Sequence, residues 1–261
     1  MTLQRQSSAG ESFSEGPLII RARRIWRGAS FGEWRGLWAI MRQGWSRGTR
    51  PWFAVGVASA TAVVYALAEN HSIRSFLWRA GGVSAALPLK VELARLPLSL
   101  LLATPYLPVW AACAQILAVF GIGEFVIGRR LTVVLVVLGH FGATLVARVV
   151  LDAIHTSVFG LTPALAHVLD TGPSAATTAV GAGLLIVARM NRSAVLLAAA
   201  LVAAYLIAPG VDGVEHLVAL ACGLGVGVIC RLAASRLSSR SFPPWLRAAR
   251  DSPLTRRLPT P

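Results

Sequence analysis

The sequence LTVVLVVLGHFGATLVARVVL occupies residues 131–151 and contains two ionisable side chains, His140 and Arg148. A run of about 20 apolar residues is the length of an α-helix that crosses the hydrocarbon core of a bilayer. The whole chain agrees, because 55% of its 261 residues are hydrophobic, 14% are charged and the mean hydropathy is +0.64. Soluble domains carry about 25% charged residues. The composition therefore excludes an ordinary soluble domain and predicts a membrane protein with several spans.

Apolar runs also occupy residues 51–68, 106–121, 173–187, 193–208 and 214–230. We therefore expect an all-α, six-transmembrane-helix bundle over residues 51–232, with a basic arm at 1–50 and a basic tail at 233–261. Residues 69–97 are interrupted by charged side chains, and we expect an external loop there that partly embeds at the interface. The run at 173–187 is shorter than a full crossing, so its first residues are predicted to lie in a water-accessible dip.

Basic residues lie in short segments between the apolar runs. The chain carries 25 Lys and Arg against 11 Asp and Glu, and nine arginines precede the first run. Further arginines follow the second and fourth runs, at 129–130 and at 189 and 192. The positive-inside rule places these segments in the cytoplasm. We expect a multi-pass protein of the cell inner (plasma) membrane with cytoplasmic N- and C-termini, with membrane lipids as partners and no nucleic acid.

The arm before the first run has its own pattern. Trp34, Trp38, Met41 and Trp45 recur at spacings of three and four residues. This spacing predicts an amphipathic helix on a membrane surface. Glycines within the same segment lower helix stability, so a partly disordered basic arm is an equal alternative.

A serine and a histidine lie at matching depth in two of the runs. Ser174 is the second residue of the fourth run, and His216 is the third residue of the sixth, both counted from the outside. An imidazole that takes the proton of a serine hydroxyl creates a nucleophile, so the pair predicts a catalytic site. Two other roles stay open: Ser174 as a helix cap and His216 as a hydrogen-bond bridge between helices.

Other polar and small residues in the runs point to structural roles. We expect Glu124 to pair with Arg129 or Arg130, and His140 to bond a neighbouring helix. Gly223, Gly225 and Gly227 should let the fourth and sixth helices approach closely. The cysteines and histidines lack metal-ligand spacing, so no metal or cofactor is expected.

The segments around these residues resemble a known family. Gly172-Pro173-Ser174-Ala175 looks like the Gly-x-Ser-Gly motif of rhomboid intramembrane serine proteases, and His216 followed by Gly223 looks like their histidine helix. Gly123-Glu124 with Arg129-Arg130 is similar to the end of another rhomboid helix. The segments at 169–174 and 214–217 resemble divergent rhomboid-like membrane proteins of actinobacteria more closely still.

This resemblance covers about residues 51–232 and implies a function. It implies Ser174 as nucleophile and His216 as general base, acting on a transmembrane protein substrate, with Gly172 and Gln115 supporting the oxyanion site. Two features depart from the family pattern: Ala175 stands where rhomboids carry glycine, and Gln115 is the sole amide in the second run, which lacks the family's His and Asn. The alternative is a catalytically inactive rhomboid-like protein that binds transmembrane helices as clients.

Overall fold

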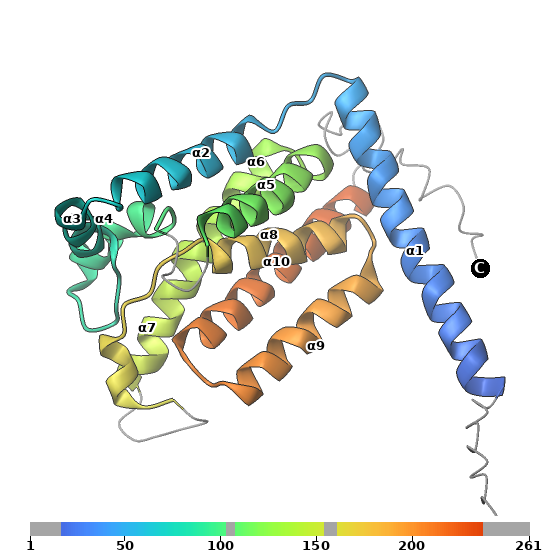
Figure 1. Cartoon of the computed structure of the whole chain (residues 1–261). Helices are drawn as coiled ribbons and strands as arrows, with labels where there is room; N and C mark the ends of the chain where they lie inside the picture. The colour runs from blue at the N-terminus through green and yellow to red at the C-terminus, as the bar shows by residue number, and fades with distance from the viewer. Residues whose placement is uncertain (1–16, 103–107, 154–160, 237–261) are drawn as a thin grey trace, which may run out of the picture.

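The computed structural model describes residues 17–102, 108–153 and 161–236, with side chains described from Gly32 to Ser235. The predicted tail beyond residue 236, the first 16 residues of the arm and the first residues of the predicted second run lie outside the described residues. Within the described ranges the chain is mostly helical and forms no named strand (Figure 1). The elements are α1 (Pro17–Ser46), α2 (Trp52–Leu67), α3 (His71–Gly81), α4 (Leu89–Ser99), α5 (Val109–Val126), α6 (Arg129–Val137), η1 (Leu138–Gly142), α7 (Ala143–Ala153), η2 (Pro163–His167), α8 (Ser174–Val187), α9 (Asn191–Ile207) and α10 (Val211–Arg236).

Each of the six predicted apolar runs is helical over most of its described residues. The stretches Val109–Val126, Arg129–Ala153 and Val211–Ser235 are long and apolar enough to cross a membrane. The other three apolar helices, α2, α8 and α9, are shorter. Large apolar side chains on their outer faces stay exposed, for example Leu206 and Ile207 of α9. The all-α membrane character is therefore confirmed, whereas a complete six-span bundle stays a prediction.

The segment at residues 69–97 contains helix α3 and most of helix α4, and its placement outside the membrane and at the interface stays a prediction. The carboxamide oxygen of Asn70 accepts hydrogen bonds from the N–H groups of Ser72 and Ile73, which caps α3. A single antiparallel bridge then joins Val83 to Asp170, just before α8. The segment between α2 and α5 is thus fastened to the start of α8.

Two buried glutamates neutralise arginines in the bundle. Glu124 is 3% exposed; one carboxylate oxygen accepts from Arg129 Nε at 2.9 Å, and the other accepts from the N–H of Ala54 at 2.8 Å. The predicted pairing with Arg129 is confirmed, and the same side chain caps α2. Arg148 binds Glu92 of α4 at 2.5 Å, which explains how an arginine is tolerated near the C-terminal end of a long apolar helix.

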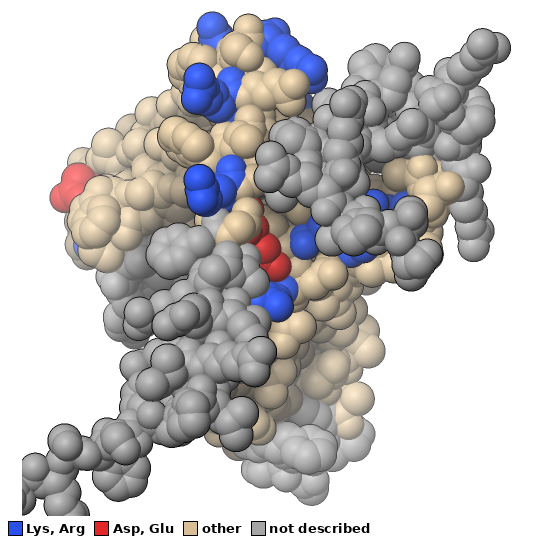
Figure 2. Space-filling model, turned by 90° about the vertical axis from the view of Figure 1, so that its right-hand side faces the viewer, with Lys and Arg blue, Asp and Glu red and all other residues tan. Residues whose placement is uncertain are grey.

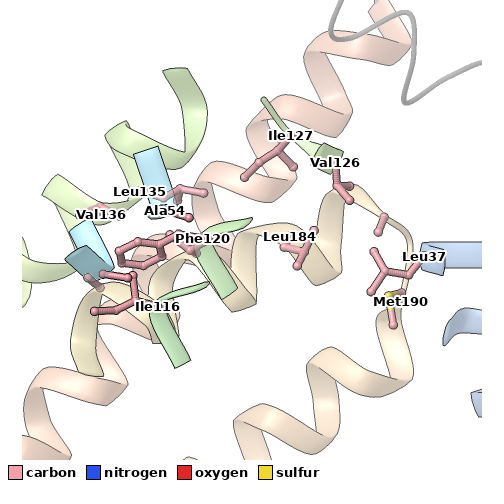
Figure 3. Packing of buried hydrophobic residues seen from close by; sticks show 14 residues of the cluster. Leu37, Ala54, Ile116, Phe120, Val126, Ile127, Leu135, Val136, Leu184 and Met190 are labelled. Atoms are coloured by element: carbon pink, nitrogen blue, oxygen red, sulfur yellow. The ribbon is translucent and has the colours of Figure 1, made fainter. Parts of the chain in front are cut away.

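The apolar core lies where α2, α5, α6 and α8 meet. Figure 3 shows Phe120 and Ile116 of α5 beside Leu135 of α6 and Ala54 of α2. At the other end of the same cluster, Leu37 of α1 meets Met190 in the turn before α9. Part of the arm therefore belongs to the core, and its helical interpretation is confirmed over Pro17–Ser46.

Candidate functional site

Ser174 is the first residue of α8 and is half-buried. Gly172, two residues earlier, has φ of 120°, a conformation that favours glycine, and its N–H donates to the carbonyl of Ser99 at 2.9 Å. The first backbone bond of α8 runs from Thr177 N–H to the Pro173 carbonyl. The N–H groups of Ser174, Ala175 and Ala176 therefore have no partner within the helix. No side chain caps this end among the described residues, so Ser174 does not act as a helix cap.

His216 lies in the second turn of α10 and is half-buried. Asp212, one turn earlier on the same helix, is exposed. α8 and α10 pack along one another, as the two central helices of Figure 1 show. The N-terminal ends of both helices therefore carry one member of the predicted pair.

Glycines set how closely α8 and α10 approach. A Cβ added at Gly223 would lie 2.3 Å from the carbonyl oxygen of Ala179, and one at Gly227 would lie 3.0 Å from that of Gly183. The predicted close approach is confirmed for these two positions. Gly225 has nothing within 4 Å and does not belong to the contact, which corrects the prediction for that residue.

The same contacts fix the register of the two helices. Gly223 lies against Ala179, and Ala219, one turn earlier, shares a small buried cluster with Ala175. Continuing this register toward the N-termini places His216 beside the residues just before Ser174. At 1.5 Å per residue, the two positions differ by about 3 Å along the helix axis. The two positions therefore lie at a similar height along the paired helices, and their depth in a membrane stays a prediction.

The two side chains do not form a hydrogen bond in the part of the chain that the structure describes. Gln115 donates its amide to the hydroxyl of Thr177 at 2.7 Å, and that hydroxyl donates to the carbonyl of Ser174 at 2.9 Å. Gln115 thus braces the first turn of α8 through Thr177. Catalytic hydrogen bonds often tighten only when substrate is bound, so the separation is compatible with a Ser/His dyad.

A carboxyl pair lies directly beside the predicted site. The side chains of Asp170 and Glu215 contact one another, and Thr144 of α7 bonds Glu215. Burial raises the pKa of the Asp170 carboxyl above its ordinary value, and the charge of Asp212 adds to the rise. These residues each precede a member of the dyad in sequence, but no sequence signal indicates that they touch.

A serine–histidine contact that the sequence did not predict lies in the interior. Ser99 Oγ lies 2.8 Å from Nε2 of His140, and both groups lie near the carbonyl of Leu96, at 2.9 and 3.1 Å. The Ser99 hydroxyl donates to this carbonyl, and Nε2 of His140 lies within hydrogen-bond distance of both oxygens. The hydroxyl proton of Ser99 is therefore already engaged by the Leu96 carbonyl. The predicted structural role of His140, a bond to a neighbouring helix, is confirmed.

The described residues contain no group of three or more His, Cys, Asp or Glu side chains suited to a metal ion. No family model, curated protein or solved structure matches this chain. What the site does must therefore be argued from its own residues.

Proposed function

We propose that this chain is a rhomboid-type intramembrane serine protease that cleaves a membrane-protein substrate. The observation that carries the proposal is the register of α8 and α10, which brings His216 to the level of Ser174 at an uncapped helix start. In this proposal all six apolar helices cross the inner membrane. Both termini, with the arginine-rich turns, are cytoplasmic.

The proposed chemistry uses the residues of this site alone. Ser174 Oγ attacks the carbonyl carbon of the scissile peptide while its proton passes to the imidazole of His216. The oxyanion accepts hydrogen bonds from the free N–H groups in the first turn of α8, where the helix dipole is positive. His216 then gives the proton to the leaving amine, and water hydrolyses the acyl-enzyme by the reverse transfers.

A second candidate function is a catalytically inactive rhomboid-like protein that holds transmembrane helices. Its supporting observations are the missing Ser174–His216 bond within the described chain and the engagement of Gln115 with Thr177. Loss of one oxyanion donor costs about 10²- to 10³-fold in kcat. In this alternative the chain binds a client helix without cutting it.

Labelling with a fluorophosphonate serine-hydrolase probe separates the two functions. We expect the detergent-solubilised full chain to label, and Ser174→Ala and His216→Ala to abolish the signal. Ser99→Ala is the matched control, because Ser99 also touches a histidine but is buried, and its hydroxyl donates to the Leu96 carbonyl. A helical circular dichroism spectrum for each variant shows that it is folded.

The outcomes divide cleanly. Signal that survives in Ser174→Ala, or that is lost in Ser99→Ala alone, overturns the assignment of the nucleophile. Absence of labelling in a folded wild-type protein supports the client-binding alternative, and capture of crosslinked transmembrane partners then becomes the decisive measurement.

A further inference from the structure

Helix α1 runs across one end of the other helices (Figure 1). Its packed side includes Leu37, Ile40 and Gly44, and a Cβ added at Gly44 would lie 2.9 Å from the Phe125 ring. Glu33 fastens the helix from the same side: its carboxylate accepts from the N–H groups of Arg192 and Ser193, at 3.3 Å each, and from the Ser193 hydroxyl at 2.7 Å. The described part of α1 is thus held in a fixed position on the bundle.

An apolar groove of about 200 Å³ lies between α1 and the end of α5. Its walls are Trp38, Met41, Arg42 and Trp45 of α1 and Phe125 of α5. Trp38 and Trp45 are 66% and 59% exposed, so more than half of each side chain faces outward. The centres of the Trp45 and Phe125 rings, which both line the groove, lie 6.0 Å apart.

Positive charge borders this groove without carboxylate partners. Among the described residues, no Asp or Glu lies within ion-pair distance of Arg35, Arg42, Arg47 or Arg50, and all four are exposed. The guanidinium of Arg50 lies over the Trp45 ring, 4.9 Å from its centre. Figure 2 views this end of the molecule and shows Lys and Arg side chains dispersed over a largely uncharged surface.

The groove opens where α5 ends, one residue after Phe125. α5 is one of the helices long and apolar enough to span a membrane, so its end marks the boundary between hydrocarbon and headgroups. Tryptophan favours this boundary because its ring is apolar and its N–H is polar. Arginine binds phosphate oxygens with its planar fork of donors.

We propose that the groove binds one anionic phospholipid of the surrounding bilayer. An acyl chain lies against Trp38, Met41 and Phe125, and the phosphate lies between Arg42 and Arg50. The groove is apolar and the surrounding charge is positive and unpaired, so the ligand must combine a hydrocarbon chain with a negative headgroup. This binding site is independent of the proposed protease activity, since α1 lies at the opposite end of α8 from Ser174.

Native mass spectrometry of the delipidated full chain tests the site. Phosphatidylglycerol and phosphatidylcholine with identical acyl chains are titrated into the same detergent. We expect phosphatidylglycerol to be retained in preference to phosphatidylcholine, and Arg42→Gln to weaken its retention about five-fold, the effect of one arginine near an anionic headgroup. Trp38→Ala should weaken retention of both lipids, because it removes a wall of the groove.

Matched controls separate the groove from general surface charge. Arg130→Gln removes an exposed arginine outside the groove, and Trp110→Ala removes a tryptophan that is 72% exposed near the start of α5. Both should retain phosphatidylglycerol like the wild type. Equal losses in Arg42→Gln and Arg130→Gln would overturn the proposal, as would complete displacement of the lipid by inorganic phosphate. If the wild type forms a dimer that Trp38→Ala does not form, the occupant of the groove is a second copy of the chain, and the lipid proposal is wrong.

Discussion

Asp170 carries the clearest pH dependence at the scale of single residues. Burial raises the pKa of its carboxyl in the folded chain, whereas the unfolded value is about 3.9. The folded state therefore holds the proton more tightly, and its stability falls as the pH rises from the unfolded pKa through the folded one. Asp170 pairs with Val83 just before α8, so the loss of stability affects the segment next to the proposed nucleophile.

We expect Asp170→Asn to make this slope shallower. Asparagine keeps the shape and the backbone bridge but cannot ionise, so the unfolding midpoint of the variant should decline less than that of the wild type; the neighbouring Glu215 carboxyl still ionises in both proteins. Thermal unfolding in detergent, followed by tryptophan fluorescence from pH of about 4 to about 8, measures the difference. Ser174→Ala, which leaves every carboxyl in place, should keep the wild-type slope. The interpretation is wrong if Asp170→Asn declines as steeply as the wild type.

Residue contacts across the bundle were only partly predictable. The pairing of Glu124 with Arg129 follows from their spacing, because the two residues lie five positions apart in sequence. Ser99 and His140 lie 41 positions apart, and nothing in either neighbourhood distinguishes their contact from others at the same depth. Depth can be counted along an apolar run, whereas the neighbour of a side chain depends on how helices are arranged around one another.

At the scale of elements, the contact between α8 and α10 depends on the absence of a side chain at Gly223. We expect Gly223→Ala to force the helices apart, because its Cβ would collide with the Ala179 carbonyl. Overpacking of this kind costs about 1–3 kcal/mol. The unfolding midpoint should fall, and fluorophosphonate labelling at Ser174 should be lost with the helix register.

Gly225→Ala is the matched control on the same helix. It adds the same methyl group where nothing lies within 4 Å, and alanine favours the helix by up to about 1 kcal/mol. Its unfolding midpoint should equal or exceed that of the wild type. Equal destabilisation by the two substitutions would show that helix propensity, and not close packing, governs this interface.

The two short helices between α2 and α5 could not be predicted from the periodicity of the sequence. α3 and α4 are 11 residues each, and the intervening Gly82–Pro88 segment disrupts any continuous pattern. Isolated helices of this length are marginal, so tertiary contacts must stabilise them. Arg148, which reaches the Leu87 carbonyl and Glu92, supplies such contacts from α7. The long apolar runs needed no such context, which is why their helical state was predictable.

At the scale of the whole molecule, the arginine-rich turns converge on one end. α1, the α5–α6 turn and the α8–α9 turn all meet there, through Arg50, Arg129 and Glu33. We expect this end to be cytoplasmic. The N-terminal ends of α8 and α10, which carry Ser174 and His216, then open toward the outside.

Cysteine accessibility in intact cells tests this orientation. In a background without Cys113, Cys222 and Cys230, a membrane-impermeant maleimide should label Arg79→Cys of α3 and should leave Arg35→Cys of α1 unlabelled. Permeabilised cells serve as the control, because both positions are exposed and should then react. Labelling of Arg35→Cys in intact cells would invert the topology and move the proposed cleavage site to the cytoplasmic side.

Glu124 and Glu33 accept hydrogen bonds from the first turns of α2 and α9, and these distant contacts set an order of events during synthesis. The N–H of Ala54 in α2 gains its partner only once Glu124, 70 positions later, has been made. The bond between Glu33 and Ser193 can form only later, because Ser193 lies 160 positions after Glu33 in sequence. Helix α1 therefore has its full set of contacts only after the start of α9 has been made. Until then its tryptophans and arginines are free to hold the unfinished chain at the membrane surface.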